Sequence, residues 1–279
     1  MQPITTEIVS RTIIKRPADS HKGSYGRVML IGGNQNFGGA IIMAATAATY
    51  SGAGLVTVAT DPSNFTSLHA RLPEAMVIDY HQTDTLLNML TGMDVIIIGP
   101  GLGTDTIADQ LLTAVIAATH APQRLVIDGS ALTLLAQQPR SLPATDIVVT
   151  PHQMEWQRLS GIAIKDQTPT ANHDAQKRLG VTAVVKAHRT TVYTDERVWF
   201  NPGGTPAMAT GGMGDTLAGM IGGFVGQFDD FTAAILSAVY LHSAIADDLA
   251  ATRYVVLPHQ ISTRIPTYMH RFSQIERPS

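Results

Sequence analysis

A glycine-rich segment in the last third of the chain carries the residues best suited to phosphate chemistry. It reads Ala209-Thr210-Gly211-Gly212-Met213-Gly214-Asp215-Thr216-Leu217-Ala218-Gly219, and a helix is predicted to begin at or next to Asp215. Glycines let the backbone bring its N–H groups close to a ligand, and a helix N-terminus adds unpaired donors and partial positive charge. A carboxylate beside a bound phosphate can take a proton from an attacking hydroxyl. The segment therefore predicts a phosphate site with Asp215 as its base.

The same segment has a purely structural alternative. Gly211–Gly214 could form only a flexible loop, with Asp215 complementing the helix dipole. It is not a Walker A loop, because no Gly-Lys-Ser/Thr follows it. Its place near the end of the chain also argues against a dinucleotide-binding fingerprint.

Two further polar positions stand where short apolar runs end. Thr150-Pro151-His152-Gln153 is typical of a helix start, with Thr150 as N-cap, Pro151 at the first helical position and Gln153 in a capping box. That arrangement would leave His152 able to donate to a ligand. Lys186 ends an apolar strand, where an unpaired ammonium is unfavourable unless it meets an anion or solvent. The alternatives are an incidental histidine, a surface lysine and an Asp128 that only caps the next helix.

Short apolar runs alternate with longer helical stretches along most of the chain. The predicted strands are Arg27–Ile31, Leu55–Ala59, Ala75–Ile78, Val95–Ile98, Leu125–Ile127, Ile147–Val149 and Val181–Val185, followed by a hairpin of Thr190–Thr194 and Arg197–Phe200. The predicted helices include Ala40–Tyr50, Thr106–Thr119, Ala171–Leu179, Asp215–Gln227 and Phe231–Ala251. Strands that are apolar on both faces indicate a parallel sheet covered on both sides. We therefore predict one doubly wound α/β domain over residues 1–279.

Ligands of open parallel sheets bind beyond the carboxyl ends of the strands. Five polar or glycine-rich segments follow predicted strands: Gly32-Gly33-Asn34, Gly99-Pro100-Gly101-Leu102-Gly103, Asp128-Gly129-Ser130, Thr150-Pro151-His152 and Lys186-Ala187-His188. We expect these segments to meet at one edge of the sheet and to form one site.

The composition narrows the class of protein. Of 279 residues, 44% are apolar and 15% charged, the net charge is −3, and there is no cysteine. Thiol nucleophiles, disulfides and cysteine metal sites are excluded, and no basic surface for nucleic acid is indicated. Met1–Lys15 does not resemble a signal peptide, and glycines interrupt the apolar stretch Gly38–Thr60. We expect a cytoplasmic protein with neither a nucleic-acid nor a membrane partner.

Several blocks, in order along the chain, resemble the ADP-dependent NAD(P)H-hydrate dehydratases, ribokinase-like enzymes that repair hydrated nicotinamide cofactors. The blocks are His21-Lys22-Gly23-Ser24-Tyr25-Gly26, Ile31-Gly32-Gly33, Gly38-Gly39-Ala40, Ser51-Gly52-Ala53-Gly54-Leu55-Val56, Gly99–Gly103, Asp128-Gly129, Thr150-Pro151-His152 and Ala209–Gly219. The resemblance implies a ribokinase-like α/β fold with a central, mostly parallel β-sheet and helices on both faces. It also implies that ADP, or ATP in some members, phosphorylates the hydroxyl of the S epimer of hydrated NADH or NADPH. Loss of phosphate then restores the cofactor and leaves AMP and phosphate.

The resemblance also implies roles for particular residues. Ala40, Gly103, His152 and Asp215 would contact the hydrated cofactor, with Asp215 as catalytic base. The nucleotide would be held by Lys186, Ala187, His188, Arg189, Thr190 and Gly214. A Mg²⁺ ion would bridge the phosphates, with Glu155 as the candidate for its water shell. A homotetramer and functional pairing with a separate NAD(P)H-hydrate epimerase are implied as well.

The sequence departs from the family pattern in three places. Ala187 stands where glycine is expected after the lysine, Gln153-Met154 stands where Pro-Gly is expected, and Met213 replaces a threonine. Two other functions remain open from the sequence. One is a vitamin or sugar kinase of the same fold, resembling hydroxyethylthiazole kinase, and the other is a non-catalytic nucleotide-binding protein.

Overall fold

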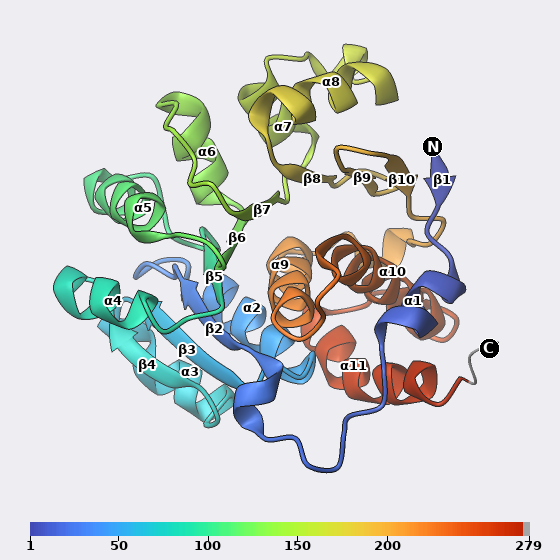
Figure 1. The fold of residues 1–279 in the computed structure, drawn as a ribbon, viewed down its shortest axis with the longest axis horizontal. Helices are drawn as coiled ribbons and strands as arrows, with labels where there is room; N and C mark the ends of the chain where they lie inside the picture. Colours follow the sequence, from blue (N-terminus) through green and yellow to red (C-terminus); the bar gives the residue numbers. More distant parts are fainter. Residues whose placement is uncertain (276–279) are drawn as a thin grey trace.

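The molecule is built around a ten-stranded sheet with helices on both faces (Figure 1), seen in a computed structural model that describes residues 1–275. The strand order is β1-β10-β9-β8-β7-β6-β5-β2-β3-β4. In sequence order the strands are β1 (Gln2–Pro3), β2 (Arg27–Ile31), β3 (Leu55–Thr60), β4 (Met76–Asp79), β5 (Val95–Ile98), β6 (Arg124–Ile127), β7 (Asp146–Val149), β8 (Thr182–Val185), β9 (Thr191–Tyr193) and β10 (Val198–Phe200).

The neighbouring strands β8, β7, β6, β5, β2, β3 and β4 are all parallel, whereas β9 runs antiparallel to both of its neighbours, β8 and β10. The register aligns the ends of the central strands, because Ile31 of β2 pairs with Ala59 of β3 and with Ile98 of β5. The loops that follow these strands therefore leave the sheet at one edge, which is called the carboxyl edge below.

Alternate residues of each strand enter two separate hydrophobic cores. Val28 and Leu30 of β2 pack into one core, and Met29 and Ile31 pack into the other. The first core contains residues of α1 (Thr6–Thr12), α2 (Gly38–Tyr50), α3 (Phe65–Arg71), α9 (Met213–Val225), α10 (Phe231–Ala250) and α11 (Pro258–Ser273). The second contains residues of α4 (Thr83–Leu90), α5 (Thr106–Ala118), α6 (Ser130–Gln137), α7 (Gln153–Ser160) and α8 (Pro169–Leu179).

Helix α9 occupies a central place on the first face. It packs against α2, α10 and the strands β5 and β6, and Figure 1 shows it in orange beside the middle of the sheet. Gly219 makes the close approach to α2 possible, since a Cβ added there would collide with the carbonyl of Ala44. This packing fixes the amino end of α9 above the carboxyl ends of the central strands.

Helix α10 is the one helix within residues 1–275 that is long and apolar enough to cross a membrane. However, 67% of its apolar window is buried inside the protein, where it contacts α9, α1 and α11. The glycine-interrupted segment 38–60 contains α2 and β3.

The predicted fold class is confirmed, and the predicted strands and helices match the observed ones within two residues. Helix α9 begins at Met213, two residues before Asp215, with Gly212 as its N-cap. One local prediction is wrong, because the N-cap of α7 is His152, not Thr150. Strand β1 and helices α1, α3, α4, α6 and α11 were not predicted from the sequence.

Candidate active site at the carboxyl edge of the sheet

Backbone hydrogen bonds join the loops that follow the strands. Gly33 N donates to Pro100 O at 2.9 Å, and Asn34 N donates to Gly101 O at 2.7 Å. On the other side of the sheet, Lys186 N donates to Pro151 O at 2.8 Å. The expectation that these segments share one edge is therefore confirmed.

The Lys186 ammonium points inward and is paired. Its Nζ donates to Asp128 Oδ1 at 2.9 Å, and only 21% of the lysine side chain is exposed. Burial opposes its charge, but the carboxylates of Asp128 and Glu155 outweigh burial and raise the pKa of Lys186. Lys186 is thus a fixed positive charge within the site, and the surface-lysine alternative is wrong.

Asp128 holds this ammonium and does not cap a helix. Its Oδ1 also accepts a hydrogen bond of 2.6 Å from Thr150 Oγ1, while α6 has Gly129 as its N-cap and no side-chain cap. The Thr150 hydroxyl is turned toward Asp128, and the first N–H groups of α7 donate to His152 Nδ1 instead. The capping alternative for Asp128 and the predicted N-cap at Thr150 are therefore both wrong.

Asp215 lies in the first turn of α9, half-buried and facing the same cluster. Burial, and secondarily the negative charge of Asp128, raise the pKa of Asp215 to about 6, with Lys186 opposing the shift. A carboxyl with this pKa is ionised at neutral pH and still basic enough to accept a proton. A carboxylate with these properties is able to act as a general base.

The amino end of α9 lies against the lysine. A Cβ added to Gly214 would be 2.9 Å from Lys186 Nζ, so the helix N-terminus and the ammonium meet with only a glycine hydrogen between them. Unpaired N–H groups and a positive charge at one point form an anion site. The structure thus brings together Gly214, Asp215 and Lys186, as predicted from the sequence.

His152 is held by a reciprocal capping box. Its Nδ1 accepts from the N–H groups of Met154 (3.1 Å) and Glu155 (3.2 Å), and Glu155 Oε2 accepts from His152 N at 2.8 Å. Because Nδ1 is an acceptor, a neutral His152 carries its proton on Nε2. The imidazole is exposed and can donate that proton to a ligand, as the sequence indicated.

Ala40 and Gly103 lie together at the β2–β5 part of the edge. A Cβ added to Gly101 would be 3.0 Å from Ala40 Cβ, and one added to Gly103 would be 2.5 Å from Asn34 Nδ2. Gly103 also has φ = +87°, a conformation that side chains rarely adopt. The glycines therefore keep this stretch of the edge open beside Ala40.

The predicted nucleotide segment connects β8 to β9 at the rim of the site. Ala187, His188 and Arg189 are exposed; Arg189 donates to the carbonyl of Pro202. Thr190 O accepts from Asn201 N at 2.9 Å. The segment is thus anchored to the Asn201–Gly204 loop but presents its own side chains outward.

The carboxylates at this edge are better suited to a metal ion that arrives bound to phosphates than to one that only protein side chains coordinate. Among residues 1–275, no three His, Asp or Glu side chains cluster as a metal site. Asp128 has one oxygen engaged in the bonds described above, which leaves the other for metal-bound water, whereas Glu155 has Oε2 bonded to His152 N and Oε1 3.6 Å from His152 Nε2. Magnesium typically takes one or two carboxylates, substrate phosphates and waters, and the residues present suit that arrangement.

One buried histidine near Lys186 was not among the residues singled out from the sequence. His242 of α10 is 6% exposed, and its Nε2 has no hydrogen-bond partner among the described residues. Burial, aided by the charge of Lys186, lowers the pKa of His242 to about 4, so the imidazole is neutral. A single histidine within an apolar helix offers no pattern that would reveal this position.

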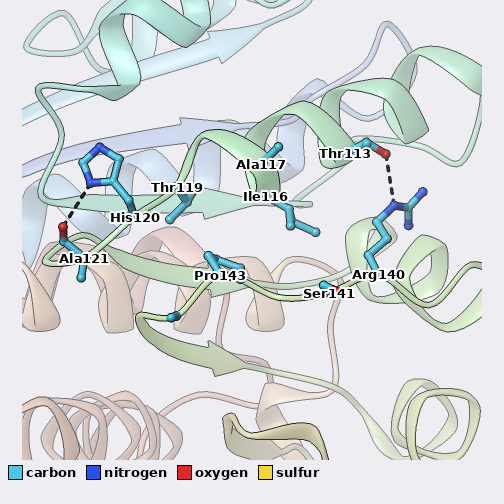
Figure 2. A pocket seen from close by; sticks show the side chains of 10 residues that line it. Thr113, Ile116, Ala117, Thr119, His120, Ala121, Arg140, Ser141 and Pro143 are labelled. Carbon is cyan, nitrogen blue, oxygen red and sulfur yellow. Dashed lines mark hydrogen bonds between the residues drawn. The ribbon is translucent and has the colours of Figure 1, made fainter.

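The hollow in Figure 2 lies away from this edge. It has a volume of about 540 Å³ and lies between α5 and the segment that follows α6. His120 Nδ1 is 3.1 Å from Ala121 O, and Arg140 is bonded to Thr113 and Asp109. None of the predicted site residues lines it, so we place the site at the carboxyl edge.

Comparison with known proteins identifies close relatives. The model of the family described as NAD(P)H-hydrate dehydratase matches residues 28–267. An ADP-dependent (S)-NAD(P)H-hydrate dehydratase of Lactiplantibacillus plantarum is 94% identical over 278 residues, which cover 100% of both chains.

Two solved structures are similar over nearly the whole chain. A ribokinase-like superfamily protein from Enterococcus faecalis is 52% identical, with a TM-score of 0.96 and coverage of 99% of this chain and 97% of the other. An ADP/ATP-dependent NAD(P)H-hydrate dehydratase from Bacillus subtilis, co-crystallised with ATP/Mg²⁺, is 29% identical, with a TM-score of 0.86 and coverage of 97% and 98%.

Proposed function

The chain belongs to the NAD(P)H-hydrate dehydratase family, and on that premise we propose that it catalyses the ADP-dependent dehydration of (S)-NADH hydrate and (S)-NADPH hydrate. ADP phosphorylates the ring hydroxyl, and departure of phosphate restores NAD(P)H, leaving AMP and phosphate. The enzyme is a hydro-lyase. The observation that carries the proposal is Asp215, a half-buried base at the amino end of α9 facing the Lys186 ammonium.

The chemistry assigns a separate task to each group. Asp215 takes the proton from the ring hydroxyl as that oxygen attacks the terminal phosphate of ADP. Lys186 and the N–H groups at the start of α9 stabilise the charge on the phosphate oxygens. Phosphate is a far better leaving group than hydroxide, so the lone pair on the ring nitrogen can then expel it.

The remaining predicted contacts position the two substrates. His152 would donate its Nε2–H to the hydrated cofactor, and Ala40 and Gly103, at the β2–β5 part of the edge, would contact it as well. The segment from Lys186 to Thr190, which includes Ala187, His188 and Arg189, together with Gly214 would hold ADP or ATP. The exposure of the middle of this segment leaves it free to close on a nucleotide.

We also propose that Mg²⁺ accompanies the nucleotide, with Asp128 and Glu155 contacting its water shell. The ion would neutralise charge on the transferring phosphoryl group. Support comes from the second carboxylate oxygen of Asp128, from the position of Glu155 beside Lys186, and from the Bacillus subtilis relative, which was co-crystallised with ATP/Mg²⁺. A homotetramer, a cytoplasmic location and a separate epimerase that supplies the S epimer remain proposals, based on the family resemblance.

A direct assay tests the activity. Purified protein is incubated with (S)-NADH hydrate and Mg²⁺, with ADP, with ATP or with no nucleotide, while absorbance of reduced nicotinamide is followed. We expect absorbance to return only with nucleotide, and AMP to appear when ADP is the donor. A stable phosphorylated product without NADH would instead indicate a kinase, and nucleotide binding without any turnover would indicate a binding protein.

A further inference from the structure

A small cavity lies at the end of the carboxyl edge that is farthest from the nucleotide segment. Its volume is about 200 Å³, and its lining includes Asn34, Asp61, Tyr80 and Asp105. It adjoins a predicted cofactor contact, because Asn34, which lines the cavity, has its Nδ2 only 2.5 Å from where a Cβ added to Gly103 would lie. We call it the β4 cavity. It is smaller than pockets that hold whole small-molecule ligands, which measure roughly 300–1,000 Å³, so it suits one part of a longer molecule.

The β4 cavity is lined by a buried tyrosine whose hydroxyl has no side-chain partner among the described residues. Tyr80 is only 4% exposed, lines the cavity, and makes no side-chain hydrogen bond to any of residues 1–275. Its ring packs edge-on against that of His81, with 4.6 Å between centroids. A buried phenol that faces an open space is a donor held ready for a ligand.

Two carboxylates line the same space. Both oxygens of Asp61 have partners: Oδ1 accepts from Ser63 N and Oγ, at 2.9 and 2.6 Å, and Oδ2 is paired with His81 Nε2 at 3.3 Å. Asp105 Oδ1 caps α5 by accepting from Ala108 N at 2.9 Å. The second oxygen of Asp105 therefore remains free to accept, whereas a ligand would have to share Asp61 Oδ2 with His81.

The sheet fixes how far this cavity is from the reacting atoms. Helix α9, which carries Asp215, packs on β5 and β6, whereas Tyr80 directly follows β4. Because Asp215 faces Asp128, which directly follows β6, the order β6-β5-β2-β3-β4 separates the two positions by four strand spacings, or about 19 Å at about 4.8 Å each. A dinucleotide with its nicotinamide ring at Asp215 and its chain passing Gly103 would place its far end in the β4 cavity.

We propose that the β4 cavity binds the adenosine ribose of the hydrated dinucleotide and thereby favours NADH hydrate over NADPH hydrate. This inference rests on the proposed function. The ribose diol can donate to the free oxygen of Asp105 and to Asp61 Oδ2, which it would share with His81, while accepting from the Tyr80 hydroxyl. A 2′-phosphate would instead bring negative charge against two carboxylates, and acidic side chains at a ribose 2′-OH are a general means of rejecting the phosphate.

The test compares kcat/KM for the two hydrates. We expect the unmodified enzyme to prefer NADH hydrate by about tenfold or more, a typical effect of one unfavourable charge contact. In the Asp61→Asn/Asp105→Asn double variant, the amide oxygens can still accept from Ser63 N and Ala108 N, but both charges are removed. The preference for NADH hydrate should fall by about tenfold, mainly because kcat/KM for NADPH hydrate rises. Asp84→Asn, an exposed change in the first turn of α4, is the matched control and should leave the ratio unchanged.

Tyr80→Phe tests the hydroxyl alone. It removes one donor and preserves the buried ring, so KM for NADH hydrate should rise by about fivefold to tenfold with kcat nearly unchanged. Melting curves confirm that each variant is folded. Unchanged KM in this variant would remove Tyr80 from the subsite.

A binding titration separates this inference from the proposed function. NADH and NADPH, followed by their own fluorescence, probe the same cavity without turnover. One outcome is that the unmodified protein binds NADH more tightly than NADPH, that the double variant loses this preference, and that neither hydrate is converted. That result would support the ribose subsite and reject the dehydratase activity. Equal binding of NADH and NADPH, together with equal kcat/KM for both hydrates in all variants, would overturn the subsite.

Discussion

Asp215 combines two properties that a general base requires. It lies at the amino end of α9, where a phosphate can be held, and burial keeps its pKa well above that of an exposed aspartate. Asp215→Asn removes the base but preserves shape and a hydrogen-bonding group. We expect turnover to fall about 10²–10⁴-fold, with nucleotide affinity unchanged in a calorimetric titration.

The Asn variant also has a clear contrary outcome. Near-normal turnover would exclude Asp215 as the base, even if binding were unaffected. Parallel loss of nucleotide affinity would instead assign Asp215 to binding. The Asp84→Asn variant is a suitable control for the loss of one surface carboxylate.

The raised pKa of Asp215 predicts the acid limb of the pH profile. The base works only when it is ionised, so kcat/KM should rise with pH to half its maximum at about 6 and then level off. Lys186 lowers this pKa, so Lys186→Met should move the limb to higher pH. A pH profile of both proteins measures the shift, and a limb near pH 4 in either would contradict the assigned environment.

Lys186 is predicted to act mainly in holding the nucleotide. Lys186→Ala removes a charge-assisted contact to phosphate, so the nucleotide Kd should rise by about tenfold or more. The rate of the bound complex should fall less. Because Asp128 would lose its partner, a melting curve must accompany the titration, and Lys177→Ala on the surface of α8 is the control. Equal nucleotide affinity in Lys186→Ala and the unmodified protein would refute this role.

At the scale of one element, the two glycines Gly211 and Gly214 near the start of α9 differ in how much space surrounds them. A Cβ at Gly214 would be 2.9 Å from Lys186 Nζ, whereas a Cβ at Gly211 would meet no atom within 4 Å. Gly214→Ala should therefore push the ammonium aside and weaken nucleotide binding by about tenfold. Gly211→Ala, in the same loop, should bind nucleotide normally.

Titration of ADP into both alanine variants measures this difference. If both variants bind ADP as tightly as the unmodified protein, the amino end of α9 does not contact the phosphates. If both variants lose affinity equally, the cause is loop flexibility and not contact with Lys186. The pair is informative because both changes add the same single methyl group.

Local patterns predicted elements well where the determinants are local. The strands are contiguous β-branched runs, and a helix after Gly211–Gly214 follows from glycines and apolar spacing. The N-cap of α7 was misplaced: the Thr150 side chain lies against Asp128, 22 residues earlier in the chain, and the helix is capped by His152. No short window of sequence reveals the contact with Asp128.

At the scale of the molecule, the sequence predicted that loops would share an edge but not which side chains would meet there. The Lys186–Asp128 pair joins residues 58 positions apart. Strand β1 has only two residues and pairs with β10 near residue 200. Such contacts depend on strand order, which hydrophobic periodicity does not encode. The family resemblance could supply roles for Ala40 and Gly103, but not the β4 cavity beside them.

The two hydrophobic cores are joined through one sheet, and the N-terminal segment is tied to it. Strand β1 pairs with β10, and α1 packs on α10 (Figure 1). Residues 1–279 are therefore expected to unfold as one domain, in a single cooperative transition. Separate melting of the two faces would contradict the predicted single domain.

The two tryptophans can report on the cores separately. Trp156 is fully buried in the core on the α4–α8 face, whereas Trp199 packs against the core on the α9–α10 face. Trp199→Phe leaves the first reporter and Trp156→Phe leaves the second. In each variant the fluorescence midpoint should coincide with the circular-dichroism midpoint of the same protein, because loss of either core removes a face of the shared sheet. A fluorescence transition that precedes loss of helix in one variant would show that its face unfolds alone.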